Sequence, residues 1–309
     1  MATKLLIPAS VKTIDTSFLS DFLLCEEYAV DEKNENYKSV DGVIFDPSGE
    51  TLIGYPHSKP DAEYEVPAKT EKIGERAFYN NYALTKVTFP KSLRTIGEYA
   101  FGACSNLTTV EFNKGLKEIG NNAFSTVPLA NVTLPSSIVT IGSSAITLTQ
   151  DYGRLELPEK LEKMGLFAFG SSYDSSFTQD VIRIPARLKF EKSSINRVLF
   201  EKYEVDEKNE YHTVVDGMLM SKDGMTLTAV PTLMEGDLIV PEGTLYIDYA
   251  ALDYCDLITD IYLPDSILDA GGAISKDYST GEYKYVIHCS EGSEVQKALD
   301  AKGIPWEAR

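Results

Sequence analysis

Histidine, cysteine and tryptophan are scarce in this 309-residue chain, and positive charge is in deficit. The sequence has three histidines, four cysteines and one tryptophan, and its 29 Lys and Arg residues are set against 47 Asp and Glu residues, a formal net charge of -18. No Cys-x-x-Cys pair is present, so the usual zinc-binding pattern is missing. A surface this acidic repels phosphate groups, which argues against a nucleic-acid partner or an anionic membrane surface.

Long apolar runs are also missing, so we expect no membrane insertion within this chain. The first residues, Met1 to Pro8, lack the apolar core of a signal peptide. The protein is therefore expected to be either cytosolic or an exported protein from which a signal peptide has been removed. The few cysteines do not make a disulfide framework in a chain of this length, and we expect four free thiols, at Cys25, Cys104, Cys255 and Cys289.

Catalytic motifs are not found. His57, His212 and His288 do not cluster, and none lies in a metal-binding motif. There is no nucleophile elbow or phosphate-binding loop, and no carboxylate pair is marked as buried for glycoside hydrolysis. The segments that begin at Asp31 and Asp206 have a lysine where a calcium loop needs an oxygen ligand, so they are interpreted as acidic connectors. We expect a non-enzyme with no cofactor and no metal.

The chain does contain a recurring sequence motif. It reads Ile-Gly-x-x-Ala-Phe, followed by a variable stretch and Leu-x-x-Val-x-Phe. Copies open at Ile73, Ile96, Ile119, Ile141 and Met164, at spacings of 23, 23, 22 and 23 residues. A fixed period in the low twenties is the signature of a leucine-rich-repeat solenoid. One such repeat cannot bury its apolar face alone, so its stability comes from stacking on its neighbours.

Each part of the recurring motif predicts a local structure. The alternating end predicts short parallel strands with one buried face, closed by proline in most copies, at 86–89, 109–112, 131–134, 154–157, 181–184 and 260–263. The Ile-Gly pair is expected to turn the chain, because glycine tolerates unusual backbone angles. The x-x-Ala-Phe part is expected to form short helical turns. Their phenylalanines should stack as an internal ladder, made of Phe78, Phe101, Phe124 and Phe169.

A longer repeat is superimposed on the short one. Residues 26–42 recur at 201–217, an offset of 175, and each copy predicts a β-hairpin insertion. Near the end, Ser293 is a candidate N-cap and Gly303 a candidate stop for a helical cap. The predicted fold is one elongated α/β repeat domain, 1–309. It divides into a partial repeat (1–29), a hairpin (30–66), repeats (67–204), a second hairpin (205–240), degenerate repeats (241–288) and the C-terminal cap (289–309).

The repeats, the Val-Asp-Gly turns at 40–42 and 215–217, and the segment Cys-Ser-Glu-Gly-Ser at 289–293 with its following helix resemble the BspA-like leucine-rich-repeat family of bacterial cell-surface proteins. The resemblance covers nearly the whole chain. It implies export, surface display and adhesion to host proteins, host cells or other bacteria. The chain departs from that pattern, since neither a signal peptide nor a wall-sorting signal is recognised in it.

Two surfaces are candidates for binding. The first is the row of outward strand residues, because repeat proteins bind along extended faces: Thr88, Glu111, Thr133, Glu156, Arg183 and Tyr262. The same row is equally what the solvated side of a sheet looks like. The second is the insertion between Phe169 and Val181, where Tyr173 and Phe177 either anchor a partner or pack back onto the repeats. We expect binding on the row or the insertion and not at a histidine.

The expected function is that of a monomeric, non-enzymatic extracellular adhesion protein that presents its repeat surface to a host or bacterial protein. Two alternatives stay open. Exposed tyrosines among the 18 in the chain could stack on sugar rings, which would make it a carbohydrate-binding surface protein. The chain could also be a passive spacer within a larger surface protein.

Overall fold

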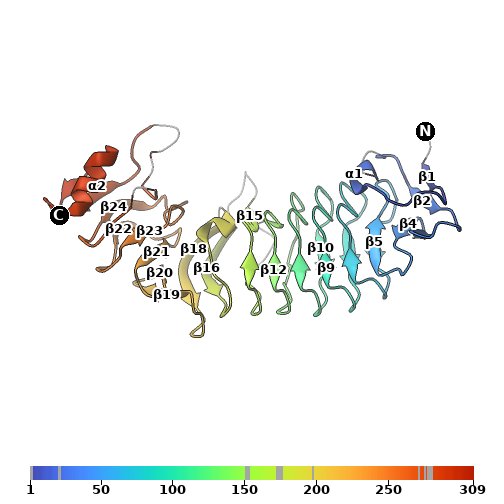
Figure 1. The fold of residues 1–309 in the computed structure, drawn as a ribbon, viewed down its shortest axis with the longest axis horizontal. Helices are drawn as coiled ribbons and strands as arrows, with labels where there is room; N and C mark the ends of the chain where they lie inside the picture. The colour runs from blue at the N-terminus through green and yellow to red at the C-terminus, as the bar shows by residue number, and fades with distance from the viewer. Residues whose placement is uncertain are drawn as a thin grey trace. The chain divides into compact units, whose positions relative to one another are not determined.

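The computed structural model describes residues 3–19, 22–149, 154–171, 177–196, 198–270, 272–274, 276 and 281–309. The chain forms two compact units, 1–177 and 178–309. In the first unit, successive coils of the chain lie side by side and pair through short parallel strands, as Figure 1 shows from β5 to β12. This confirms the predicted repeat architecture with parallel strands.

The first unit begins with a strand pair and a hairpin. β1 (Lys4–Ile7) pairs in parallel with β2 (Glu27–Val30), and a short helix, α1 (Thr16–Leu19), lies between them in sequence. The hairpin strands β3 (Lys38–Val40), β4 (Val43–Phe45) and β5 (Thr51–Gly54) pair antiparallel, as predicted. Asp41 and Gly42 form the two-residue turn between β3 and β4 with φ of 51° and 79°, as the primed hairpin turns require.

The Ile-Gly pairs contribute strands that the sequence analysis did not predict. Each repeat isoleucine or methionine lies in a two-residue parallel strand: β7 (Lys72–Ile73), β9 (Thr95–Ile96), β11 (Glu118–Ile119), β12 (Thr140–Ile141) and β14 (Lys163–Met164). With the hairpin they form one eight-stranded sheet. The glycine is needed here because the coils approach closely, not because of a positive φ. A Cβ at Gly142 would lie 2.5 Å from the backbone nitrogen of Asn121.

The predicted strands at 86–89 and 109–112 are confirmed. β6 (Glu63–Glu65), β8 (Lys86–Thr88) and β10 (Thr109–Glu111) form a three-stranded parallel sheet. The predictions at 131–134 and 154–157 were wrong, because no strand forms there. Asn131 has a φ of 52°, which a strand residue does not adopt. The alternation still holds in both segments, since Val132 and Leu155 are buried.

The predicted helical turns at x-x-Ala-Phe were also wrong. The residue before each alanine has a left-handed φ of 50° to 54°, which a right-handed helix excludes, at Arg76, Tyr99, Asn122, Ser144 and Phe167. These segments are tight turns. β13 (Ile146–Leu148) and β15 (Phe169–Ser171) follow two of them as a parallel pair.

The phenylalanine ladder is confirmed. The ring centroids of Phe78 and Phe101 lie 4.6 Å apart, and those of Phe101 and Phe124 lie 5.1 Å apart, with interplanar angles of 13° and 1°. Ile146 continues the ladder to Phe169, since it bridges to Phe124 and pairs with Phe169. All four rings are fully buried. All four cysteines of the chain are free and buried, as predicted.

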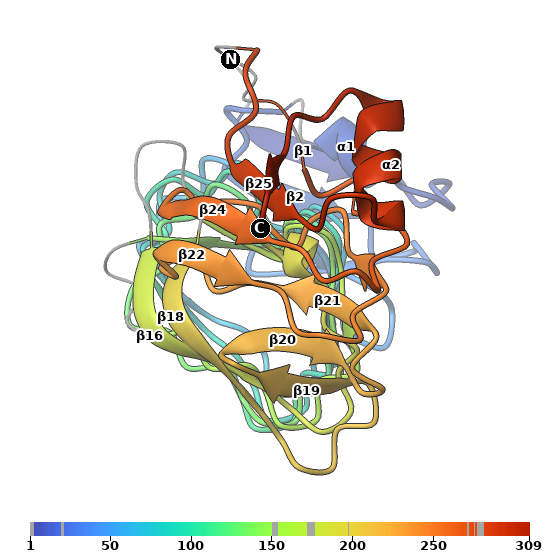
Figure 2. The ribbon, with the colours of Figure 1, turned by 90° about the vertical axis from the view of Figure 1, so that its left-hand side faces the viewer.

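The described strands of the second unit, β17 apart, form three sheets. β16 (Phe177–Ile184) and β18 (Val198–Val205) form a two-stranded sheet, with the 3-10 helix η2 (Lys192–Ser194) and β17 (Ile195–Asn196) between them in sequence. The hairpin strands β19 (His212–Val215), β20 (Met218–Ser221) and β21 (Thr226–Ala229) continue into β23 (Tyr246–Ile247). The last sheet contains β22 (Gly236–Ile239), β24 (Ile258–Tyr262), β25 (Val286–Cys289) and β26 (Glu307–Ala308), all parallel. Figure 2 looks onto these strands.

The C-terminal cap forms as predicted. The hydroxyl oxygen of Ser293 accepts a hydrogen bond from the Gln296 N–H at the start of α2 (Glu294–Lys302). Gly303 ends the helix with a φ of 66°. Ile304 is then buried in the core, and β26 pairs with β25, so the chain returns to its last coil.

Candidate binding surfaces

In the first unit the predicted row is polar and paired. Glu65, Thr88 and Glu111 lie side by side on adjacent strands. The ammonium of Lys86 lies 2.6 Å from the carboxylate of Glu111, and this hydrogen bond raises the pKa of Lys86. Thr133 and Glu156 are exposed beyond the sheet, and Glu156 pairs with Arg154 at 3.6 Å. Exposed pairs of this kind contribute little to stability or binding, so this face is what a solvated sheet surface looks like.

Arg183 in the second unit has the same character. Its Nε lies 2.7 Å from a carboxylate oxygen of Glu204, and Lys202 lies 3.5 Å from the other oxygen. The hydrogen bond from Arg183 lowers the pKa of Glu204. Both partners of the closer pair are about half exposed. The arginine is thus engaged by its own chain.

Tyr262 lies in a different environment. Ile239, Tyr262, His288 and Glu307 occupy neighbouring positions across the last sheet. The rings of Tyr262 and His288 stack with centroids 4.3 Å apart and an interplanar angle of 9°. Ile239 is 68% exposed beside them, and Val286 is 42% exposed. We call this outward surface of β22, β24, β25 and β26 the C-terminal face; its residues are Asp237, Ile239, Asp260, Tyr262, Val286, His288 and Glu307.

Acidic groups surround the aromatic pair on the C-terminal face. Nε2 of His288 lies 2.8 Å from Oδ1 of Asp260, and this hydrogen bond lowers the pKa of Asp260. Partial desolvation first, and then the charges of Asp237, Asp260 and Glu307, raise the pKa of Tyr262. All three histidines were expected to lie outside the binding surface, yet the structure places His288 directly beside Tyr262. The segment that carries it, β25, had not been predicted as a strand.

The second predicted surface is only partly described. Tyr173 lies outside the described residues. Phe177 is the first residue of β16 and is 3% exposed. Its ring is therefore packed against the repeats and is not an exposed anchor, which corrects the first of the two alternatives for this residue.

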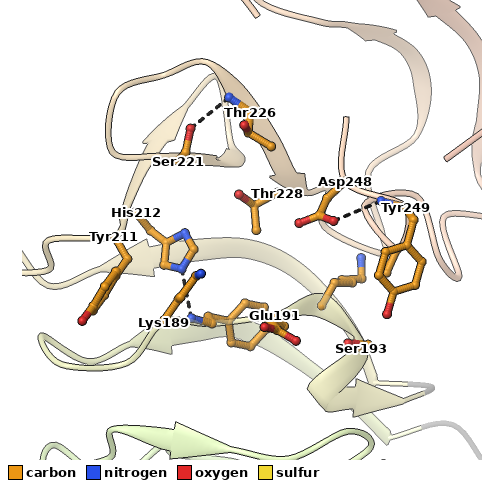
Figure 3. Close-up of a pocket in the computed structure, with 13 residues that line it drawn as sticks. Lys189, Glu191, Ser193, Tyr211, His212, Ser221, Thr226, Thr228, Asp248 and Tyr249 are labelled. Atoms are coloured by element: carbon orange, nitrogen blue, oxygen red, sulfur yellow. Dashed lines mark hydrogen bonds between the residues drawn. The ribbon is translucent and has the colours of Figure 1, made fainter. Parts of the chain in front are cut away.

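The other two histidines are buried. His57 and His212 are each 4% exposed, and burial lowers the pKa of both. Nε2 of His212 accepts a hydrogen bond of 2.9 Å from the Phe190 N–H. Its Nδ1 has no partner of good geometry, although the nearby Met220 carbonyl partly offsets the lowering of the pKa. His212 lines a pocket of about 380 Å³ (Figure 3).

Lowering the pH from 7.5 to 5.5 is expected to lower the free energy of unfolding through His57 and His212. In the unfolded chain each has a pKa near 6.5 and binds a proton first, because the folded-state pKa is lower. The stabilisation is present above about pH 6.5 and is lost as the pH falls, at up to ~1.4 kcal/mol per pH unit for each histidine. Urea denaturation at both pH values measures the loss. An equal loss in a His57→Gln/His212→Gln variant would contradict this origin.

Buried asparagines are the structural residues that the sequence analysis missed. The amide of Asn81 donates to the carbonyls of Pro56 and His57, and its oxygen accepts from the N–H groups of Ala83 and Leu84. Asn34 and Asn209 make equivalent bonds beside the two hairpins. Both lie in the segment that recurs at an offset of 175 residues, and this recurrence was the available signal.

Comparisons with known proteins agree with the repeat pattern. The family model described as a BspA type leucine-rich-repeat region matches residues 71–202, in six copies. Residues 71–202 therefore form a BspA-type leucine-rich-repeat region. A comparison with curated proteins finds no match. In the part of the chain that the structure describes, no helix has the length and apolar character needed to cross a membrane.

Three solved structures illustrate what this chain is similar to. A leucine-rich cell surface protein from Faecalibacterium prausnitzii is 19% identical, with a TM-score of 0.49, over 75% of this chain and 71% of that one. The pneumococcal vaccine antigen PcpA is 17% identical, with a TM-score of 0.40, over 96% of this chain and 53% of that one. A leucine-rich repeat protein from Bacteroides capillosus is 30% identical, with a TM-score of 0.31, over 34% and 86%. This chain thus spans about half of the PcpA structure.

Proposed function

We propose that this protein is a non-enzymatic, extracellular adhesion protein and that its C-terminal face binds a protein ligand. The stacked pair of Tyr262 and His288, with Ile239 exposed beside it, supports the proposal. Aromatic side chains next to exposed apolar ones form the centres of protein interfaces. The polar, internally paired row of the first unit has no comparable centre. The family resemblance to bacterial surface proteins supports the extracellular location.

The negative charge around Tyr262 and His288 favours a positively charged ligand. Asp237, Asp260 and Glu307 lie near Tyr262, and the whole chain carries a net charge of -18. A basic protein segment with apolar side chains complements such a surface. The charges would speed association and make it depend on salt. Because the side chains project from paired strands, binding would cost little conformational entropy.

The test is a binding screen by biolayer interferometry against purified extracellular-matrix proteins and intact bacterial cells. An Ile239→Ser/Tyr262→Ala/His288→Ala variant should bind at least tenfold more weakly than the wild type. A Thr88→Ala/Glu111→Ala/Glu156→Ala variant, which changes the same number of outward positions in the first unit, should bind normally. Circular dichroism confirms that both variants fold. Loss of binding in the first-unit variant alone would contradict the proposed location.

A further inference from the structure

A pocket in the second unit carries a separate inference. It lies between the segment 189–193, the hairpin strands β19 to β21 and the turn at 248–250, and its volume is about 380 Å³. Pockets that hold small molecules begin at about 300 Å³. All thirteen lining residues belong to this one unit, and Figure 3 shows them around the opening.

Three polar side chains with spare hydrogen-bonding capacity line the buried part of the pocket. Ser193, His212 and Thr228 are 8%, 4% and 6% exposed. Nδ1 of His212 is buried and has no hydrogen-bond partner of good geometry, although the Met220 carbonyl lies near it. The hydroxyls of Ser193 and Thr228 make no side-chain hydrogen bond within the described residues. Since Nε2 of His212 accepts from the Phe190 N–H, Nδ1 carries the proton of the neutral ring. Buried polar groups are normally paired, so this wall is suited to a ligand that brings hydroxyl groups.

The rim adds aromatic surfaces and charges of both signs. Tyr211 and Tyr249 are 44% and 65% exposed, and Figure 3 shows them on opposite sides of the pocket. Lys189 contributes a positive charge, while Glu191 and Asp248 contribute negative ones. The ammonium of Lys192 is already used, because it donates to the Val230 carbonyl.

These features together select the chemistry of the ligand. Lys189 would repel a cation, and Glu191 and Asp248 would repel an anion. An apolar molecule would leave Nδ1 of His212 and the hydroxyls of Ser193 and Thr228 without partners. A neutral molecule with many hydroxyl groups can donate to the carboxylates, accept from Lys189 and His212, and pack its C–H face on a tyrosine ring. We propose that this pocket binds a neutral saccharide of one or two sugar units, independently of the C-terminal face.

The chain supplies a design for blocking the pocket. Residues 26–42 and 201–217 are two copies of one segment, and Tyr37 in the first copy is equivalent to His212 in the second. Its hydroxyl accepts a hydrogen bond of 2.9 Å from the Ile14 N–H, the same role that His212 has toward Phe190. A tyrosine is therefore compatible with this place in the fold. His212→Tyr should keep the backbone N–H paired while its larger ring occupies the pocket and removes the imidazole donor.

The test is saturation-transfer NMR on the whole protein with a panel of neutral mono- and disaccharides, in parallel with sialylated and sulfated sugars. At least one neutral sugar should bind, with a Kd on the order of 1 mM or tighter. Affinity should fall at least tenfold in Tyr249→Ala, in Thr228→Val and in His212→Tyr. Tyr82→Ala, which removes a tyrosine that is 51% exposed in the first unit, should bind like the wild type.

Three results would overturn the inference: no neutral sugar binds, only the anionic sugars bind, or the pocket variants bind like the wild type. Thermal unfolding followed by circular dichroism shows that each variant is folded. The Ile239→Ser/Tyr262→Ala/His288→Ala variant should retain sugar binding. Failure of the saccharide site and failure of the C-terminal face are therefore distinguished by the same set of proteins.

Discussion

Replacing Phe101 with alanine is expected to lower the free energy of unfolding by ~3–5 kcal/mol. The ring is fully buried and stacks on Phe78 at 4.6 Å and on Phe124 at 5.1 Å. Phe89 also meets it edge-on at 5.8 Å. The substitution leaves a cavity that these rigid neighbours cannot close, in the middle of a stack where each coil depends on the next.

Urea denaturation followed by far-ultraviolet circular dichroism measures the effect on the first unit. Trp306 fluorescence does not serve, because that residue lies in the second unit. Tyr82→Ala is the control, since it removes a ring that is 51% exposed. A loss below ~1 kcal/mol for Phe101→Ala would show that the stack contributes little to stability.

Replacing Asn81 with alanine is expected to cost a similar amount, ~3–5 kcal/mol, although the side chain is small. The residue is fully buried and makes four hydrogen bonds to the backbone of its own coil and the preceding one. Its removal leaves the His57 carbonyl and two N–H groups without partners, while the Pro56 carbonyl keeps the Lys59 N–H. Each unpaired buried group costs ~1–3 kcal/mol before any relaxation.

Two further variants separate this effect from a general loss of volume. Asn81→Asp keeps the volume and the acceptor of the Ala83 and Leu84 N–H groups, but it places a buried carboxylate oxygen against two carbonyls. Its stability at neutral pH should therefore be at least as low as that of Asn81→Ala. Asn106 makes one exposed hydrogen bond, to the Tyr82 carbonyl, so Asn106→Ala should cost less than ~1 kcal/mol. Equal losses for Asn81→Ala and Asn106→Ala would contradict the role given to the buried amide.

The features predicted correctly from the sequence are those with a local or periodic signal. The helical cap was found because Ser293 and Gly303 mark its two ends within eleven residues. The phenylalanine ladder was found because equivalent positions recur every 23 residues. Both signals depend on the residue types alone, without knowledge of the distant partners.

The features that were missed depend on partners in the next coil or on backbone angles with no residue preference. A strand of two residues, such as Thr95–Ile96, is too short for an alternating pattern, and its pairing with Lys72–Ile73 is visible only in three dimensions. The left-handed turn position holds arginine, tyrosine, asparagine, serine and phenylalanine in successive repeats. No shared residue type marks it, so a helical turn was the natural but incorrect prediction.

The candidate sites divide in the same way. Tyr262 was predicted from strand alternation. Its partner His288 was not, because the repeats between the two residues are too degenerate in sequence to fix the register of the two strands. The pocket beside His212 is assembled from three separate segments, at 189–193, 211–228 and 248–250. No single stretch of sequence carries its pattern.

The most direct test of the central claim is hydroxyl-radical footprinting of the protein bound to the partner found in the screen, with mass spectrometry to read the oxidation of each side chain. If the C-terminal face binds the partner, Ile239, Tyr262 and His288 become protected from oxidation in the complex. Tyr82 in the first unit and Tyr249 at the pocket should stay as reactive as in the free protein. Protection of Tyr82 or Tyr249 with an unchanged Tyr262 would contradict the assignment of the binding surface.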